Sequence, residues 1–331
     1  MTAELVHASR NSFVENIYRG DVVVVDQEGN TLFKLGDAKK PTYWRSSAKP
    51  FQILPFVEAG GLEAHDITGE ELALMCASHG GEPEHIRAVG KLLHKINFSE
   101  DDLRCGAAAP MYQPAANDIL KQQKEWTQLH NCCSGKHSGM LAIASMKGYP
   151  IDEYENIEHP VQQEALQIAS EFTEVPVDQI GIGVDGCGAP IFYLPLNQMA
   201  KAYAMLSRPE VLPDPKRADA LKTIGKAMTD HPWFVAGTGR LDTILMEVSQ
   251  GRLLAKLGAD GVYCVSVMGE GIGIALKIEC GVIRAIEPVI VELLRRMYFI
   301  SDAEAQEMGR QLDFSIYNHR KEVIGVMKTV F

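Results

Sequence analysis

The 331-residue sequence lacks any apolar run close to the roughly 20 residues that a membrane-spanning helix needs. Its first seven residues carry neither a basic nor an apolar segment, so we expect no secretion signal. Basic residues are outnumbered, because 32 Lys and Arg stand against 43 Asp and Glu, for a formal net charge of −11. We therefore expect a cytoplasmic protein whose partners include neither nucleic acid nor an anionic membrane.

Cysteine is scarce, and none of the seven cysteines forms a Cys-x-x-Cys pair. An odd number without a secretion signal predicts reduced thiols rather than a disulfide framework. What is present is an ordinary globular composition, 46% hydrophobic and 23% charged, which predicts a sizeable core. The chain shows no internal repeat and no low-complexity tract.

The hydrophobic pattern places strands near both ends of the chain and helices in the middle. Strand patterns occur at residues 22–25, 31–35, 253–257, 262–267, 274–278 and 322–330, with one more at 180–184. Helical patterns occur at residues 50–58, 83–96, 131–146, 159–172, 216–228 and 288–300. We expect an α/β (α+β) fold with a mostly antiparallel sheet, because hairpin turns join its strands. Residues 1–50 and 240–331 would form the sheet domain and residues 51–239 the helical domain, with a site at their junction.

The only Ser-x-x-Lys pattern of the chain runs from Ser46 to Lys49. A serine hydroxyl becomes a good nucleophile when a neighbouring base takes its proton. A lysine can be that base once its pKa falls from about 10.4 toward about 7 to 8, as burial or a helix N-terminus would cause. A spacing of three brings the two side chains to one helix face. Alternatively, Ser46 is only a helix N-cap and Lys49 a solvated first-turn residue.

A second cluster surrounds Cys133, where Lys136 follows three and His137 four residues later. Either pair could face one ligand, and the distant Cys187 lies in a glycine-rich turn that could complete the site. Zinc accepts thiolate and imidazole ligands, and a catalytic zinc keeps one position for water. The alternative is a pair of buried thiols beside a surface lysine.

Two glycine-rich stretches are candidates for binding a substrate. The first holds Ser78, His79 and Gly80, where glycine lets the backbone approach a ligand closely. The second precedes a predicted helix and contains Arg240, which could clamp a carboxylate with two hydrogen bonds. The alternative for the second stretch is an Asp242 N-cap with Arg240 in solvent.

Six ordered motifs together resemble one known family. They are Arg-Ser-Ser-Ala-Lys-Pro at 45–50, Ala-Ser-His-Gly-Gly-Glu at 77–82, Asn-Cys-Cys-Ser-Gly-Lys-His-Ser-Gly-Met at 131–140, Gly-Val-Asp-Gly-Cys-Gly-Ala-Pro at 183–190, Ala-Gly-Thr-Gly-Arg at 236–240 and Lys-Leu-Gly-Ala-Asp-Gly-Val at 256–262. The sequence is similar to the Rhizobium-etli-type L-asparaginases, the asparaginase II family, from about residue 15 to its end.

The resemblance implies a fold like that of the serine β-lactamases and penicillin-binding proteins. It also implies a homodimer that hydrolyses L-asparagine to L-aspartate and ammonia. By similarity, Ser46 is the nucleophile with Lys49 as its base, and Ser78 and Lys256 form a second serine–lysine pair. Zinc would be held by Cys133, Lys136 and Cys187. Arg45, His79, Gly80 and Arg240 are the expected substrate-binding residues.

The sequence also departs from its relatives. The Ser-Asp-Asn and Lys-Thr-Gly elements of true β-lactamases are missing, so we expect no β-lactam hydrolysis. Asp260 stands where glutamate is the commoner family residue. Two other functions stay open at this point, a zinc-water amidohydrolase acting on another small amide and a non-enzymatic metal-binding protein.

Overall fold

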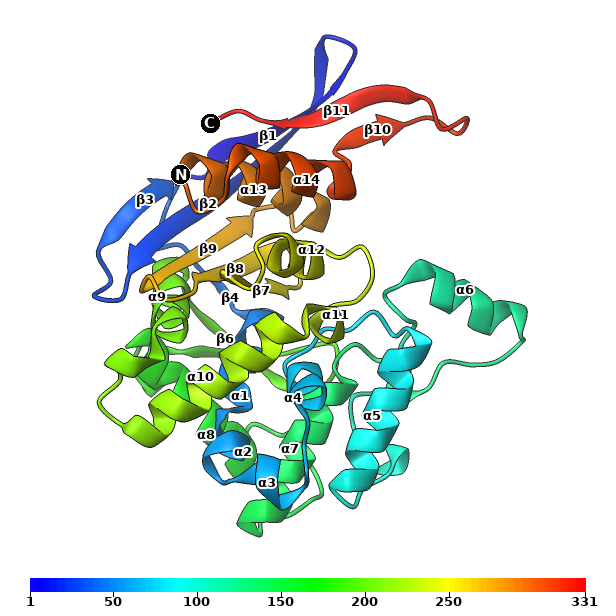
Figure 1. Cartoon of the computed structure of the whole chain (residues 1–331), viewed down its shortest axis with the longest axis vertical. Helices are drawn as coiled ribbons and strands as arrows, with labels where there is room; N and C mark the ends of the chain where they lie inside the picture. The colour runs from blue at the N-terminus through cyan, green and yellow to red at the C-terminus, as the bar shows by residue number, and fades with distance from the viewer. The chain divides into compact units, whose positions relative to one another are not determined.

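The computed structural model describes all 331 residues, which divide into two compact units (Figure 1). Unit 1 comprises Met1–Ser47, Leu194–Ser207 and Gly239–Phe331. Unit 2 comprises Ala48–Tyr193 and Arg208–Thr238. The proposed limits of the sheet and helical domains, at residues 50 and 240, stay a prediction.

Unit 1 is built on an eight-stranded antiparallel sheet with strands from both ends of the chain. The strands are β1 (Ala3–Arg10), β2 (Phe13–Asp26), β3 (Thr31–Leu35), β7 (Leu253–Gly258), β8 (Val262–Val267), β9 (Ile272–Ile278), β10 (Ser315–Tyr317) and β11 (Val323–Thr329). Their order is β10-β11-β1-β2-β9-β8-β7, with β3 pairing to β2. The predicted mixed fold, with an antiparallel sheet from both chain ends, is therefore confirmed. The short strand β4 (Pro41–Tyr43) follows β3.

The β-branched run Val22–Val25 on β2 is fully buried, since β9 pairs with it and α9 (Leu196–Ser207) packs over both strands. Helix α9 can approach β9 because Gly273 has no side chain. A Cβ there would clash with the backbone of Ala200 and Ala204. Sequence patterns missed α9, whose apolar residues lie on more than one face, and they missed β1.

Three further helices complete unit 1, namely α12 (Leu241–Val248), α13 (Ile286–Arg296) and α14 (Asp302–Leu312). Helix α12 packs on β7, and α13 packs on β1 and β11, as Figure 1 shows in yellow and orange. The contact of α12 with β7 matters for the site, because it brings the start of the helix to the strand that carries Lys256.

Unit 2 is mainly helical, as predicted. Its helices are α1 (Lys49–Gln52), α2 (Leu54–Glu58), α3 (Gly61–Ala64), α4 (Gly69–Met75), α5 (Pro83–Lys95), α6 (Gln113–Lys121), α7 (Ser134–Lys147), α8 (Pro160–Thr173), α10 (Pro215–Asp230) and α11 (Pro232–Val235). Two strands, β5 (Gly181–Val184) and β6 (Pro190–Pro195), pair antiparallel. The predicted helix at residues 50–58 is two short helices, because Pro55 lies in the first turn of α2 and breaks the hydrogen-bond ladder.

Helix α7 is the central helix of unit 2, with α2, α4, α5 and α8 packed around it. Its residues from Ser134 to Ala144 are all buried. It lies close to α4 because Gly135 has no side chain, since a Cβ there would clash with the carbonyl of Leu74. This packing sets the position of the first turn of α7, where Cys133 and Lys136 lie. None of the helices combines the length and the apolar composition that crossing a membrane requires.

Candidate functional site

The Ser-x-x-Lys segment forms one short helical stretch. Residues Arg45–Ala48 are a 3-10 helix, and α1 begins directly afterwards at Lys49. Ala48 occupies the N-cap position of α1 without a side-chain hydrogen bond, so the alternative in which Ser46 caps the helix is wrong. Ser46 is half-buried, whereas Lys49 is only 1% exposed. A solvated Lys49, the second part of that alternative, is wrong as well.

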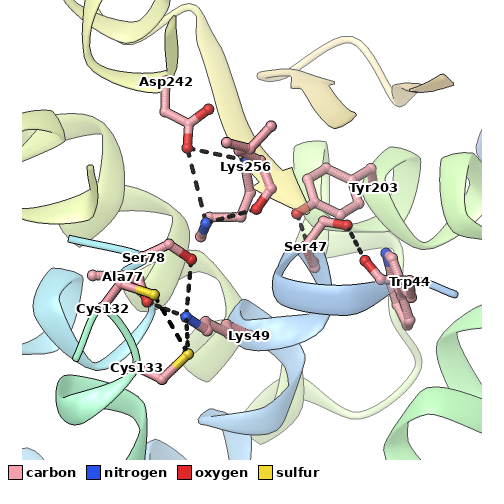
Figure 2. A network of polar contacts seen from close by, with 11 residues as sticks. Trp44, Ser47, Lys49, Ala77, Ser78, Cys132, Cys133, Tyr203, Asp242 and Lys256 are labelled. Atoms are coloured by element: carbon pink, nitrogen blue, oxygen red, sulfur yellow. Dashed lines mark hydrogen bonds and ion pairs between the residues drawn. The ribbon is translucent and has the colours of Figure 1, made fainter. Parts of the chain in front are cut away.

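The buried amine of Lys49 points to three groups of unit 2 (Figure 2). Its Nζ donates to the Ala77 carbonyl, to Ser78 Oγ at 2.9 Å and to Cys133 Sγ at 3.3 Å. No carboxylate is among these partners. The resemblance pairs Ser78 with Lys256, whereas the side-chain contact that the structure gives Ser78 within unit 2 is with Lys49.

Ser78 lies in the loop after α4, where its backbone N–H donates to Val235 at 3.0 Å. The next residue, His79, is fully buried and uses both ring nitrogens. Its Nδ1 accepts from the Gly81 N–H at 3.1 Å, and its Nε2 lies 2.8 Å from Ser134 Oγ. Burial, helped by the neighbouring His85 and Lys49, lowers the pKa of His79 well below its usual value. A neutral His79 with both nitrogens engaged holds the loop in place.

The second glycine-rich stretch is tied to the same loop through Glu82. Its carboxylate accepts from the Thr238 backbone N–H at 2.8 Å and from Thr238 Oγ1 at 2.7 Å. A Cβ on Gly80 would lie 3.1 Å from Glu82 Oε1, and one on Gly237 would lie 2.6 Å from the same atom. The two glycines therefore let the two loops close around one carboxylate, a role of Glu82 that the sequence did not reveal.

The thiols and the amine of the second cluster come together in unit 2. Lys136 Nζ donates to Cys187 Sγ at 3.2 Å, and Cys132 Sγ lies 3.9 Å from Cys133 Sγ. Cys133 is also hydrogen-bonded to Cys187. Because Cys133 contacts Lys49 too, the Ser78–Lys49 pair and the thiol cluster are one network.

The electrostatics select Cys133 as the thiolate of this network. Hydrogen bonds from Cys132 and Cys187 lower the pKa of Cys133 well below its usual value, and the charges of Lys49 and Lys136 add to this effect. The same hydrogen bonds, together with burial, raise the pKa values of Cys132 and Cys187.

The predicted zinc ligands can be tested against this arrangement. No group of three His, Cys, Asp or Glu side chains is placed to hold a metal ion. Cys133, Cys187 and Lys136 nevertheless form a buried set of two sulfurs and one amine, all at most 4% exposed. Burial alone would lower the pKa of Lys136, but the charges of Cys187 and Cys133 outweigh burial and raise it. A positive charge between these sulfurs is therefore favoured, which fits a zinc ion that replaces the lysine proton.

His137 also lies beside this cluster, in the first part of α7. Its Nδ1 lies 2.9 Å from the Tyr154 hydroxyl, while its buried Nε2 has no hydrogen-bond partner. Burial lowers the pKa of His137 well below its usual value. The ring is thus held neutral. Of the two residues that spacing placed beside Cys133, Lys136 contacts Cys187 directly, and its role as a metal ligand stays a prediction.

Lys256 lies on β7 in unit 1, and its surroundings differ from those of Lys49. It is fully buried, donates to the Leu257 carbonyl at 2.9 Å and has Asp242 Oδ2 at 3.9 Å from its Nζ (Figure 2). Asp242 lies in the first turn of α12, whose N-cap is Arg240. The alternative in which Asp242 caps this helix is therefore wrong.

The two predicted substrate-binding arginines also lie in unit 1. Arg45 has a left-handed backbone, with φ of 54°, and its guanidinium forms an ion pair with Asp260. Arg240 is half-buried, and its charge acts on Glu287. Burial raises the pKa of Glu287 to about 7, even though Arg284 and Arg240 oppose the shift. The roles of both arginines stay predictions.

Comparison with solved structures found matches of low sequence identity. A beta-lactamase from Mycobacterium bovis aligns with 85% of this chain and 95% of its own, at 12% identity and a TM-score of 0.42. A protein from Bacteroides dorei, named as a candidate beta-lactamase, aligns with 78% of this chain and 84% of its own, at 14% identity and a TM-score of 0.41. Similarity at this level supports no inference about chemistry.

A comparison with curated protein sequences found no significant match. The comparison with family models was decisive, because the model described as L-asparaginase II matches residues 6–329. This match spans both units and all six motifs quoted above. The chain belongs to the L-asparaginase II family and is an amidohydrolase of the asparaginase type.

Proposed function

We propose that the protein hydrolyses L-asparagine to L-aspartate and ammonia, with Ser46 as nucleophile and Lys49 as its base. Family membership supports the reaction. The observation that carries the mechanism is the burial of Lys49, three residues after Ser46, among partners that include no carboxylate.

The reaction would begin when Lys49, as a neutral amine, takes the proton of Ser46. The hydroxyl oxygen then attacks the side-chain amide carbon of asparagine. Ser46 lies near the start of a helical segment, and backbone N–H groups there would hold the oxyanion. The carbon–nitrogen bond breaks, ammonia leaves, and water hydrolyses the acyl-enzyme at Ser46.

Departure of ammonia requires a proton donor. We assign this step to Lys256 together with Ser78, the second serine–lysine pair of the resemblance. Ser78 Oγ accepts a hydrogen bond from Lys49 at 2.9 Å, which places this hydroxyl beside the proposed base. Arg45, Arg240, His79 and Gly80 would position the substrate, the arginines through its carboxylate.

Zinc is proposed as the cofactor, held by Cys133, Cys187 and Lys136. Once bound, it would supply a fixed positive charge beside the substrate and stiffen the pocket. The protein residues do the rest. Cys132 donates to the Cys133 sulfur, and Asn131 Oδ1 accepts from the Cys133 N–H at 2.9 Å, which fixes the start of α7. Homodimer formation and the Rhizobium-etli-type assignment are proposed on the resemblance alone, as is a cytoplasmic location.

The buried thiol–amine cluster also favours a second candidate mechanism, in which a water bound to zinc attacks the amide. Ser46 would then only bind the substrate. The two mechanisms differ in what each loss does to turnover, because only the first needs the serine oxygen as a covalent partner.

The test measures ammonia release from L-asparagine by the wild-type protein and by Ser46→Ala, each with and without a chelator. The serine mechanism predicts that Ser46→Ala loses turnover by at least about 10³-fold. The zinc-water mechanism predicts that chelation abolishes turnover whereas Ser46→Ala mainly weakens binding. Wild-type turnover in Ser46→Ala would contradict the proposal.

A further inference from the structure

Asp242 is a buried carboxylate without a role in the mechanism so far. It lies in the first turn of α12, is 1% exposed, and accepts from the Leu257 N–H at 3.1 Å through Oδ2. Taking a carboxylate out of water costs much free energy unless a positive charge or several hydrogen bonds compensate for it. The Leu257 N–H and the neighbouring Tyr263 hydroxyl are neutral partners, so a nearby positive charge adds the compensation that a buried anion needs.

That charge is the amine of Lys256, at 3.9 Å from Oδ2. Both side chains are hydrogen-bonded to the backbone of Leu257. Asp242 accepts from its N–H, and Lys256 donates to its carbonyl at 2.9 Å. The backbone of β7 thereby fixes both side chains. A carboxylate this close favours the protonated form of a buried amine.

The other titratable groups of unit 1 near this pair are neutral or positive. Tyr263 and Cys264 lie on β8, where Cys264 is the cross-strand partner of Lys256. Burial, followed by the Asp242 charge, raises the pKa of Tyr263 well above its usual value, and burial raises that of Cys264 to about 12. Arg240, at the N-cap of α12, is positive. Within this group Asp242 is therefore the anion that balances Lys256.

We propose that Asp242 is the positioning residue of Lys256, holding its amine charged and aimed so that it acts as a proton donor. The inference rests on the proposed function and deepens it, since it gives the two lysines opposite starting states. Lys49 begins neutral and accepts a proton, whereas Lys256 begins as an ammonium and donates one.

With this assignment every proton that is taken up in the reaction is also returned. Lys49 takes the proton of Ser46, the serine oxygen bonds to the amide carbon, and the carbon–nitrogen electron pair goes to nitrogen as that bond breaks. Lys256 gives its proton to this nitrogen, which leaves as ammonia. Water then loses a proton to Lys256 while its oxygen attacks the ester, and Lys49 returns its proton to Ser46. Both lysines end in their starting states.

The test compares Asp242→Asn with Asp21→Asn across a pH series, with ammonia release as the readout. The asparagine oxygen can still accept from the Leu257 N–H, so the variant removes the charge and keeps the contact. We expect kcat to fall by about 10- to 100-fold with KM changed less than about threefold. The basic limb of the kcat profile should move to lower pH by about one unit or more, because loss of the anion lowers the pKa of an ammonium.

Asp21 is a matched control in the same unit. It is fully buried, accepts from the Asp37 N–H at 2.7 Å and lies 3.6 Å from Lys40 Nζ. Asp21→Asn should lower the unfolding temperature without moving the pH profile. If Asp242→Asn does not fold, Asp242→Glu replaces it. That variant keeps the charge, and the basic limb should stay within about 0.3 unit of wild type even though kcat falls.

The inference is overturned if Asp242→Asn keeps the wild-type kcat and pH profile. It is also overturned if Asp242→Glu, which keeps the charge, moves the basic limb by about one pH unit or more, the shift expected for Asp242→Asn. The proposed function fails separately, when Ser46→Ala retains turnover. A Ser46→Ala loss combined with an unchanged profile in Asp242→Asn would refute the role of Asp242 and leave the serine mechanism standing.

Discussion

Two buried lysines of this protein have the same side chain and opposite surroundings. Lys49, in unit 2, contacts a carbonyl, a hydroxyl and the Cys133 sulfur and has no carboxylate among its partners. Lys256, in unit 1, lies beside the carboxylate of Asp242. The comparison teaches that burial alone does not assign a lysine the role of base or of acid, because the groups around each amine differ while the burial is the same.

The largest expected effect comes from removing the base. Lys49→Met should reduce kcat by about 10²- to 10⁴-fold, the range typical of a general base. The control is Lys201→Met, which removes another buried lysine, 8% exposed, that has no assigned role in the reaction. A Lys49→Met protein with wild-type ammonia release would erase the distinction between the two lysines.

The next effect concerns Cys187, the thiol that contacts Lys136. Cys187→Ser should bind zinc at least about 10-fold more weakly than the wild-type protein, because a sulfur ligand is replaced by a hydroxyl. Metal analysis of the purified protein measures this. Cys105→Ser is the matched control, since Cys105 is also buried and its pKa is raised to about 12, so it should keep its metal. Equal zinc content in both variants would contradict the assigned ligands.

A smaller effect separates the buried bases of unit 2 from a buried acid of unit 1. His79 and His137 have pKa values well below 6.5, so below about pH 6.5 the unfolded chain binds protons that the folded chain does not. Each histidine then lowers the unfolding free energy by about 1.4 kcal/mol per pH unit. Glu287 acts in the opposite direction, because its folded pKa is raised from 4.5 to about 7 and its contribution is lost as pH rises through that window.

Urea unfolding between about pH 5 and pH 7.5 measures this balance. Glu287→Gln removes the opposing contribution, so its stability should fall more steeply than that of the wild type as the pH drops below about 6.5. Parallel curves for the two proteins would show that Glu287 titrates alike in the folded and unfolded states.

The smallest effect is expected at an exposed ion pair, in contrast with the buried pair of Asp242 and Lys256. Asp260, 72% exposed, pairs with Arg45. Asp260→Asn should change the unfolding free energy by less than about 1 kcal/mol, since solvent screens such pairs. A loss several times larger, measured by urea unfolding, would mean that this pair stabilises the Ser46 turn as a buried contact does.

Much of the fold followed from the sequence because its patterns are local. The valine run of β2 and the apolar stripes of α5, α7 and α8 each predicted an element of the right type. Helix α9 escaped because it is buried on several sides and shows no clear stripe. Strand β1 escaped because its central residues alternate poorly and it is stabilised by distant partners, β2 and β11.

In the candidate site, too, the sequence predicted what depends on local spacing and missed what depends on contacts between distant residues. Spacing identified Lys49 and Cys133, and both are buried in one network. Spacing did not reveal that Cys133 joins the serine–lysine pair to the thiol cluster, since this contact links residues 84 positions apart. Nor did it reveal Asp242, because a first-turn aspartate usually lies at a helix surface and only the packing of α12 on β7 turns it inward.

The most direct test exchanges each lysine for arginine, which stays protonated at any working pH and cannot act as a base. Ammonia release from L-asparagine by Lys49→Arg and Lys256→Arg is compared with that of the wild-type protein. The account predicts that both variants lose turnover by at least about 10²-fold, because arginine can neither take the proton of Ser46 in place of Lys49 nor give a proton to the leaving nitrogen in place of Lys256. Wild-type turnover in either variant would contradict it.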